Sequence, residues 1–300
     1  MDKYFFTPAA CYGHAEMLRE MEELSRSPMA QLEILGVSPE GREIPVLRVG
    51  KPDAKYHVLL QGAIHGREHM TSWLLMGLAK QEAARGPSPD FCWHFLPMVN
   101  PDGVSVSQRF LLTKQQWTIY QADLAADRTE EDPHRYAQRW KASGSGVDLN
   151  RNFPAGWELV NGPEGPSTQN YRGTVPFSEA ETRILRDYTL RYPFAVTLSY
   201  HATGSVIYYE YGHREPVNGL SKSLGQAVAA VTGYEMEGCA GLDGAGYKDW
   251  VMASLGIPSL TIEIGKEEAP LAAWEAPDIW SRNKEVLTAV EWWLEKTQQT

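Results

Sequence analysis

The sequence predicts an α/β fold with three layers, in which helices cover both faces of a mixed, mostly parallel central sheet. Apolar segments of strand length alternate along the chain with segments of helical periodicity. The sequence contains no internal repeat and no low-complexity tract. We therefore expect residues 1–300 to form a single domain.

Before residue 100, short apolar runs alternate with segments of helical spacing. They predict, in order, a helix within 9–25, two strands within 32–49 joined at a Pro-Glu-Gly turn, a buried strand at 56–64, a helix at 71–84 and a buried strand at 91–99. This order of elements is typical of an α/β sheet.

After residue 100, a long polar stretch precedes the remaining elements. Residues 113–146 are polar and charged, and we expect an irregular excursion with a helical piece there. Ser178, followed three residues later by Glu181, is a capping-box pattern that predicts a helix start. Strands are expected at 194–200, 206–209 and 258–265, and helices at 217–232 and 278–298.

Composition and charge exclude several functions. A formal net charge of −10 argues against nucleic-acid binding, because domains that bind the phosphate backbone are normally basic. No apolar run approaches the length of about eighteen residues that a membrane span needs, and residues 1–6 lack the apolar core of a signal peptide. Cys11, Cys92 and Cys239 are widely spaced and odd in number, which favours reduced thiols. We expect a cytoplasmic protein of undetermined oligomeric state.

The segment His65-Gly66-Arg67-Glu68 is the most informative in the chain. It lies between an apolar strand and a helix, and α/β sheets bind ligands at the carboxyl ends of their strands. An imidazole and a carboxylate three residues apart can bind one metal ion, and a third distant ligand leaves a position for water. A His-x-x-Glu pair alone is common by chance, so this reading depends on other segments.

Three later segments also place polar residues beside apolar runs. Residues 146–154 read Gly-Val-Asp-Leu-Asn-Arg-Asn-Phe-Pro, and an apolar strand ends at His201. Glu263 interrupts the apolar run 258–265. Burying a carboxylate in such a strand is costly unless it has a partner or a function.

These segments, together with Asn100-Pro101-Asp102-Gly103, resemble the zinc carboxypeptidase family in order and over roughly residues 56–265. The resemblance implies the fold of that family and zinc-dependent hydrolysis of the C-terminal residue of a peptide. Within the family, residues 246–250 (Gly-Tyr-Lys-Asp-Trp) and the Thr-x-Glu-x-Gly pattern of residues 261–265 are similar to a bacterial branch. That branch includes γ-D-glutamyl-meso-diaminopimelate peptidases, which act on cell-wall (murein) peptides.

The resemblance implies one Zn²⁺ ion bound by His65, Glu68 and His201. Asp148 would accept a hydrogen bond from the second ring nitrogen of His65 and so hold its tautomer. Glu263 would be the general base, which takes a proton from the attacking water and passes it to the leaving amine.

The resemblance also implies substrate contacts. Asn150 and Arg151 would hold the terminal carboxylate, the guanidinium bidentately, and Arg67 and Tyr247 would be further contacts. Lys248 occupies the position that lines the pocket of the leaving residue, where a lysine favours a side chain with a carboxylate. Meso-diaminopimelate and glutamate both meet that condition. A solvent-facing Lys248 is the alternative.

Two positions depart from the family pattern. Lys141 stands where the family usually has an arginine that polarises the scissile carbonyl, and an ammonium acts there as a point charge rather than as a planar fork. Gly241 aligns with a mobile tyrosine of the digestive enzymes, so we expect no tyrosine in that role.

Three other interpretations are open. His65-x-x-Glu68-His69 matches an inverted zinc-protease pattern with His69 as a ligand, although that interpretation leaves His201 and Glu263 without a function. A zinc deacylase of the aspartoacylase type would cleave small N-acyl amino acids. A non-catalytic protein would bind peptides without turnover. The sequence also does not distinguish a γ-glutamyl from an α-peptide substrate.

Overall fold

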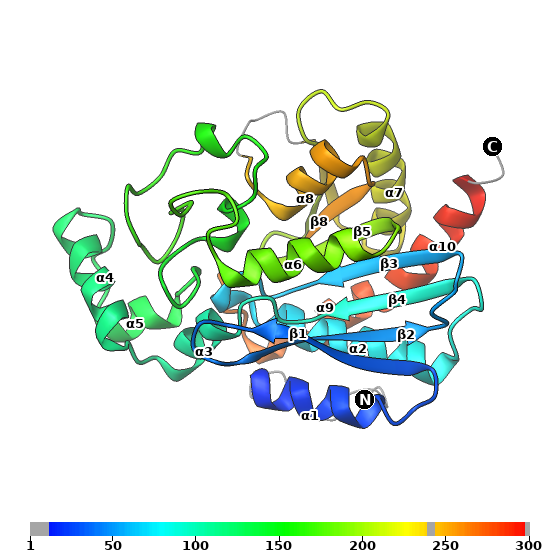
Figure 1. Cartoon of the computed structure of the whole chain (residues 1–300), viewed down its shortest axis with the longest axis horizontal. Helices are drawn as coiled ribbons and strands as arrows, with labels where there is room; N and C mark the ends of the chain where they lie inside the picture. The colour runs from blue at the N-terminus through cyan, green and yellow to red at the C-terminus, as the bar shows by residue number, and fades with distance from the viewer. Residues whose placement is uncertain (1–11, 239–243, 298–300) are drawn as a thin grey trace.

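A computed structural model describes residues 12–238 and 244–297 of the chain. Within these residues, eight strands form one sheet in the order β1-β2-β4-β3-β5-β8-β6-β7 (Figure 1). The strands are β1 Ala30–Val37, β2 Glu43–Gly50, β3 Tyr56–Gln61, β4 Phe91–Leu96, β5 Phe194–Ala202, β6 Val206–Tyr208, β7 Glu235–Glu237 and β8 Ser259–Ile264.

The centre of the sheet is parallel. β3 pairs in parallel with β4 and β5, and β5 pairs in parallel with β8. The pairs β1–β2, β2–β4 and β6–β8 are antiparallel, whereas β6–β7 is parallel. This topology confirms the predicted mixed, mostly parallel sheet. It also brings the carboxyl ends of β3, β5 and β8 to the same edge, where β5 pairs His201 with Glu263 of β8.

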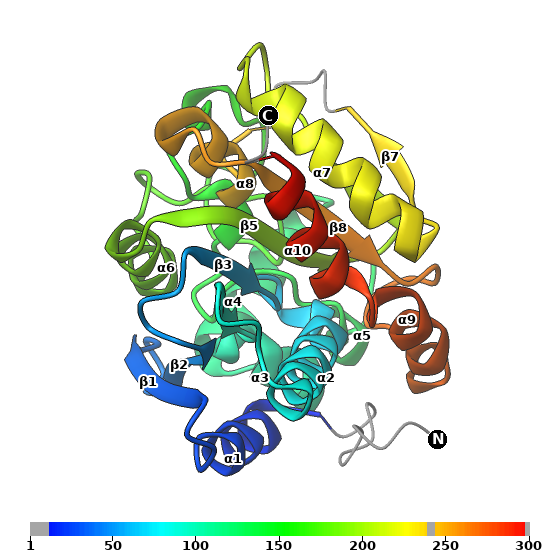
Figure 2. The same ribbon diagram turned by 90° about the vertical axis from the view of Figure 1, so that its right-hand side faces the viewer.

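Helices cover both faces of the sheet (Figure 2). The helices are α1 His14–Leu24, α2 Met70–Arg85, α3 Pro101–Arg109, α4 Lys114–Ala125, α5 Pro133–Gln138, α6 Ala180–Arg191, α7 Val217–Thr232, α8 Tyr247–Trp250, α9 Ala276–Asn283 and α10 Val286–Thr297. Alternate residues of β3 contact the two helical layers. Val58 and Leu60 pack in the core with α2, α7, α9 and α10, while Leu59 packs in a second core with α6 and α8. Among the described residues, none of these helices combines the length and apolar character needed to cross a membrane.

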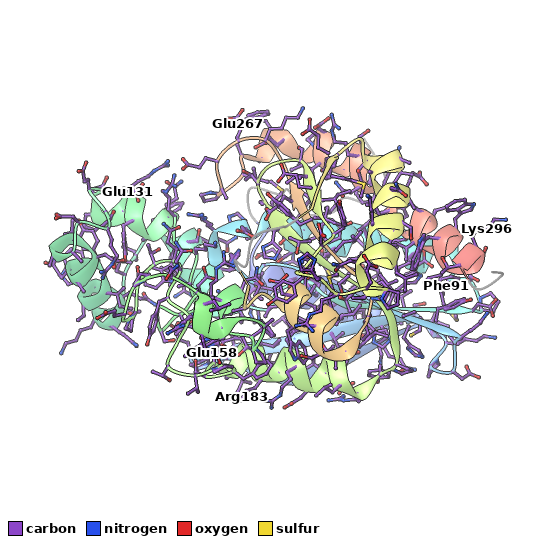
Figure 3. All side chains as sticks on the ribbon, turned by 90° about the horizontal axis from the view of Figure 1, so that it is seen from above. Phe91, Glu131, Glu158, Arg183, Glu267 and Lys296 are labelled. Atoms are coloured by element: carbon purple, nitrogen blue, oxygen red, sulfur yellow. The ribbon has the colours of Figure 1, made fainter. Side chains whose placement is uncertain are left out.

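The polar stretch 113–146 is more helical than the sequence predicted. Thr113 and Gln116 form a capping box at the start of α4, and the side chain of Asp132 accepts hydrogen bonds from two backbone amides at the start of α5. Figure 3 shows Glu131, between these two helices, and Phe91, at the amino end of β4, toward opposite ends of the molecule. The α4–α5 region therefore extends beyond the carboxyl ends of the parallel strands.

Two predicted helix boundaries were wrong. The helix expected to start at Ser178 begins at Ala180, because Ser178 donates its hydroxyl hydrogen to Glu179 and caps no backbone amide of α6. The single helix expected at 278–298 is divided into α9 and α10. Asn283, at the end of α9, donates its side-chain amide to the carbonyl of Ile279 and to Tyr234. Of the helix expected within 9–25, residues 9–11 lie outside the described residues, as do Cys11, Cys239, Gly241 and residue 298.

Candidate metal centre and active site

Three buried side chains meet at the carboxyl ends of β3 and β5. His65 follows β3, Glu68 lies in the adjoining 3₁₀ turn η2 Gly66–Glu68, and His201 lies in β5. Nδ1 of His65 is 2.8 Å from Oε1 of Glu68, and Nδ1 of His201 is 3.1 Å from Oε2 of Glu68. The two Nδ1 atoms are 3.2 Å apart. The structure thus brings together the three side chains that the sequence suggested as metal ligands.

The arrangement of these donors suits a divalent cation. Ligands of a tetrahedral zinc ion, at about 2.0–2.2 Å from the metal, lie about 3.3 Å from one another. Nε2 of His65 is 3.1 Å from Oδ1 of Asp148, so a proton on Nε2 leaves the lone pair of Nδ1 facing the carboxylate of Glu68. Burial lowers the pKa of His65 and disfavours a second proton on its ring. A cation between these atoms would relieve the repulsion of the lone pair and the carboxylate.

Asp148 connects His65 to the substrate-binding residues proposed from the sequence. It precedes the 3₁₀ turn η3 Leu149–Arg151, where its Oδ1 accepts a hydrogen bond from the backbone N of Asn150 at 3.1 Å. Nζ of Lys141 lies 3.5 Å from Oδ2 of Asp148. Burial alone would raise the pKa of Asp148, but Lys141 and His65 outweigh it and hold that pKa well below its usual value. Asp148 is therefore a carboxylate that can orient His65.

Asn100 supports the loop after β3, a function that the sequence analysis missed. Its Nδ2 donates to the carbonyl oxygens of Ile64, at 3.1 Å, and Ala142, at 2.9 Å, and its Oδ1 accepts from N of Gly103. Gly66 permits this packing, because a Cβ there would lie 2.4 Å from the carbonyl carbon of Gly103. The Asn-Pro helix start was the available sequence signal, since asparagine often caps helices and proline often follows the cap.

Glu263 lies on β8, directly beside His201 in the register of the sheet. Part of its side chain reaches solvent. Desolvation of its carboxyl group nevertheless raises the pKa of Glu263 to about 7, although the positive charges of His201 and Lys141 oppose the shift. A carboxyl group with such a pKa can both accept and donate a proton near neutral pH.

Asn150 and Arg151 lie in η3, directly after Asp148, which contacts His65. Oδ1 of Asn150 accepts a hydrogen bond from the backbone N of Tyr247 at 2.9 Å, which ties η3 to α8. Nη1 of Arg151 donates to the carbonyl oxygen of Asn150 at 3.1 Å. In the part of the chain that the structure describes, Arg151 forms no ion pair with a carboxylate. Its guanidinium could therefore bind an anionic group.

The side chains of Lys248 and Tyr247 are both buried, and the sequence did not predict their hydrogen-bond partners. Lys248 is buried, so the solvent-facing alternative is wrong, and its Nζ donates to the carbonyl oxygen of Glu210 at 2.8 Å and to Oδ1 of Asp249 at 2.6 Å. The side chain of Tyr247 is also buried and does not extend toward the metal-ligand cluster. Its hydroxyl lies 3.0 Å from Oγ1 of Thr189 on α6.

Arg67 borders a cavity of about 240 Å³ that Arg128 and Arg139 also line. Its Nη1 is 3.5 Å from the carbonyl oxygen of Arg139, and its buried Nε has no hydrogen-bond partner among the described residues. His69, the ligand of the inverted zinc-protease pattern, is not among the three side chains that meet beside β3. Burial lowers the pKa of His69 to about 4.

Comparison of the sequence with known proteins gives a family profile and several relatives. A profile of the family described as "Zinc carboxypeptidase" matches residues 16–286. The chain is 29% identical to "Gamma-D-glutamyl-L-diamino acid endopeptidase 1" of Lysinibacillus sphaericus over 285 residues, which cover 90% of this chain and 69% of that protein. It is also 29% identical to "Carboxypeptidase B" of Helicoverpa zea over 185 residues, 58% of this chain and 39% of that protein.

The solved structures show the same fold at lower identity. The crystal structure of carboxypeptidase A from Helicoverpa armigera matches with a TM-score of 0.74 and 20% identity, over 96% of this chain and 75% of that chain.

Proposed function

The chain belongs to the zinc carboxypeptidase family, and from that premise we propose that it removes the C-terminal residue of cell-wall peptides by cleaving the bond between γ-D-glutamate and meso-diaminopimelate. The observation that carries the proposal is the meeting of His65, Glu68 and His201 around one point, with Asp148 behind His65. The name of the Lysinibacillus relative, which specifies a γ-D-glutamyl-L-diamino acid bond, supports this choice of substrate.

In this proposal His65, Glu68 and His201 would hold one zinc ion, and when bound that ion would supply Lewis-acid chemistry to the attacking water and the scissile carbonyl. Glu263 accepts a proton from the water and transfers it to the leaving nitrogen as the C–N bond breaks. Lys141 supplies positive charge, in place of the arginine usual in the family, for the carbonyl oxygen as it becomes negative.

The substrate is held at its leaving residue. Arg151 and Asn150 bind the terminal carboxylate, which suits a guanidinium that forms no ion pair with any carboxylate among the described residues. Lys248 and Asp249 form an ion pair at 2.6 Å, so this pocket offers both charges rather than a lone ammonium. The distal end of meso-diaminopimelate carries an amino group and a carboxylate, and therefore complements such a pair better than the single carboxylate of glutamate. Arg67 contacts the acyl side of the substrate from the neighbouring cavity.

Product analysis by mass spectrometry tests the proposal. The zinc-loaded chain and its Glu263→Gln variant are incubated with the tripeptide L-Ala-γ-D-Glu-meso-diaminopimelate, the matching peptide ending in L-lysine, and N-acetylaspartate. We expect release of free diaminopimelate by the parent chain, slower release of lysine, and little release of either by the variant. Hydrolysis of N-acetylaspartate alone would indicate a deacylase, and tripeptide binding without turnover would indicate a non-catalytic protein. A cytoplasmic location and a single catalytic domain stay predictions from the sequence.

A further inference from the structure

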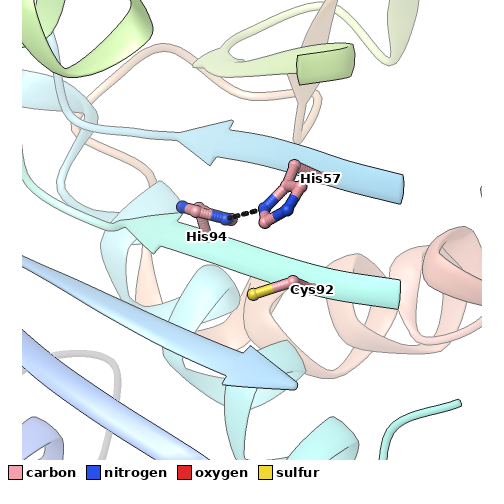
Figure 4. Close-up of side chains that lie close together, drawn as sticks. All are labelled: His57, Cys92 and His94. Atoms are coloured by element: carbon pink, nitrogen blue, oxygen red, sulfur yellow. Dashed lines mark hydrogen bonds between the residues drawn. The ribbon is translucent and has the colours of Figure 1, made fainter. Parts of the chain in front are cut away.

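A second group of metal-type ligands lies at the opposite end of β3 from the candidate active site. His57 is the second residue of β3, and Cys92 and His94 lie on the adjacent strand β4. All three are buried, and their ligand atoms lie within 4.8 Å of one another. Figure 4 shows His57 and His94 joined by a hydrogen bond, at 2.9 Å between Nδ1 and Nε2, with Cys92 nearby on the same strand as His94.

The sheet itself brings these side chains together. His57 pairs in register with Cys92, and Cys92 and His94 are two residues apart on β4. Residues two apart on a strand point to the same face of the sheet. No motif of the sequence analysis includes these residues, because the group forms only when β3 and β4 pair.

We propose that His57, Cys92 and His94 bind a second metal ion with affinity for thiolate, such as zinc or copper. Two imidazoles and one thiolate form a donor set that suits both metals. The nitrogen and sulfur ligands of a tetrahedral zinc ion lie about 3.3–3.7 Å apart. Because the three ligand atoms already lie within 4.8 Å of one another, small side-chain rotations bring them to that spacing.

Neighbouring aromatic residues hold the two imidazoles in position. Nδ1 of His94 is 2.6 Å from the hydroxyl of Tyr188 on α6. A proton on Nδ1, donated to that oxygen, leaves the lone pair of Nε2 directed toward His57 and Cys92. The ring of His57 stacks on Tyr192, with the ring centroids 5.5 Å apart. Such contacts to the outer side of a ligand orient it and strengthen metal binding.

The thiol of Cys92 loses its proton when the ion binds. Burial raises the pKa of Cys92 to about 11, so the free side chain is a thiol at neutral pH, and Arg48 opposes this shift by its positive charge. Binding forms the metal–sulfur bond and releases the thiol proton to solvent. The ion then links β3 to β4 at their amino ends. The length of β3 separates it from the candidate catalytic zinc, so its function is structural.

Cobalt binding tests this proposal independently of activity. The full chain carries Cys11→Ser and Cys239→Ser, so that Cys92 is its only cysteine, and is titrated with Co²⁺ after removal of bound metal. We expect two equivalents to bind, together with a thiolate-to-cobalt charge-transfer band in the near ultraviolet. The other site has only nitrogen and oxygen ligands and cannot produce that band.

Two further substitutions assign the sites. Adding Cys92→Ser should reduce the stoichiometry to one cobalt per chain, abolish the band and leave peptide hydrolysis by the zinc-loaded protein intact. Adding His201→Ala instead should keep the band. One equivalent of cobalt without a charge-transfer band in the parent chain overturns the proposal, as does a band that survives Cys92→Ser. Circular dichroism of each variant verifies folding, and His94→Gln, which retains the thiol, should also lose one cobalt equivalent.

Discussion

Nδ1 of His65 lies 3.2 Å from Nδ1 of His201, although 136 residues separate the two histidines in the chain. The contact results from the parallel pairing of β3 with β5, in which Gln61 lies beside Ser199. Both strands end at the same edge of the sheet, where His65 follows β3 and His201 is the second-last residue of β5. The candidate metal centre therefore depends on the adjacency of these two strands rather than on any local motif.

Replacement of His201 by alanine should remove most of the bound zinc from this centre. Two protein ligands, His65 and Glu68, are too few for a stable zinc site. Metal analysis of the purified variant, made in a Cys92→Ser background so that only this centre is measured, checks the prediction. Stoichiometric zinc in that variant would mean that another residue is the third ligand.

Replacement of Glu263 by glutamine should leave zinc binding intact and lower kcat by about 10²–10⁴, the usual contribution of a general base. The amide is similar in size to the carboxylate but cannot accept a proton at neutral pH. Turnover of the diaminopimelate tripeptide is measured together with zinc content. Activity close to that of the parent chain would exclude Glu263 as the base.

Replacement of Asp148 by asparagine should weaken zinc affinity by about 10–100-fold, the effect expected when the partner of a metal-binding histidine is lost. The amide no longer offers His65 Nε2 a negatively charged acceptor, which at present lies 3.1 Å away. Competition with a chelator of known affinity measures the change. Equal affinity in the variant and the parent would show that Asp148 does not tune the ligand.

Replacement of Lys248 by methionine should cost about 3–5 kcal/mol of the free energy of unfolding, because it leaves the carboxylate of Asp249 buried without its partner. The double variant Lys248→Met, Asp249→Asn removes both charges and should regain much of that stability. It should not regain the preference for diaminopimelate over lysine. Chemical denaturation and kcat/KM for the two tripeptides separate these effects, and a double variant with unchanged preference would exclude the pair from recognition.

Glu181, buried in the first turn of α6, should make the protein less stable as pH rises. Burial raises its pKa to about 8, whereas the unfolded chain titrates near 4.3. Between these values the folded state keeps a proton that the unfolded state has released, so the free energy of unfolding falls by up to ~1.4 kcal/mol per pH unit. Its full contribution is present only below about pH 4.

The Glu181→Gln variant isolates this effect. Thermal unfolding across the same pH range should show a flatter dependence than in the parent chain, and a higher Tm near pH 8. Parallel pH profiles for the two proteins would contradict the assignment of the raised pKa to this side chain.

Local patterns of the sequence predicted the elements whose signals are confined to a few residues. The apolar runs at 56–64, 91–99, 194–200 and 258–265 correspond to β3, β4, β5 and β8, and the helix predicted at 217–232 is α7. Periodicity succeeds there because burial on one or both faces forces a regular spacing of apolar residues. Apolar periodicity did not reveal the polar helix α4, which begins at a capping box and packs only a few residues, such as Ile119 and Tyr120, in a core.

The motif residues His65, Glu68, His201 and Glu263 could be named from the sequence because their segments, placed beside apolar strands, resemble those of the zinc carboxypeptidase family. The contacts of these side chains could not be predicted from the sequence. The pairing of Lys248 with Asp249, the burial of Tyr247 against Thr189 and the group His57, Cys92 and His94 depend on side-chain directions and on strand register. Register and strand order are set by packing of the whole sheet. The sequence by itself determined which residues could perform the chemistry, and only the tertiary structure decided which of them meet.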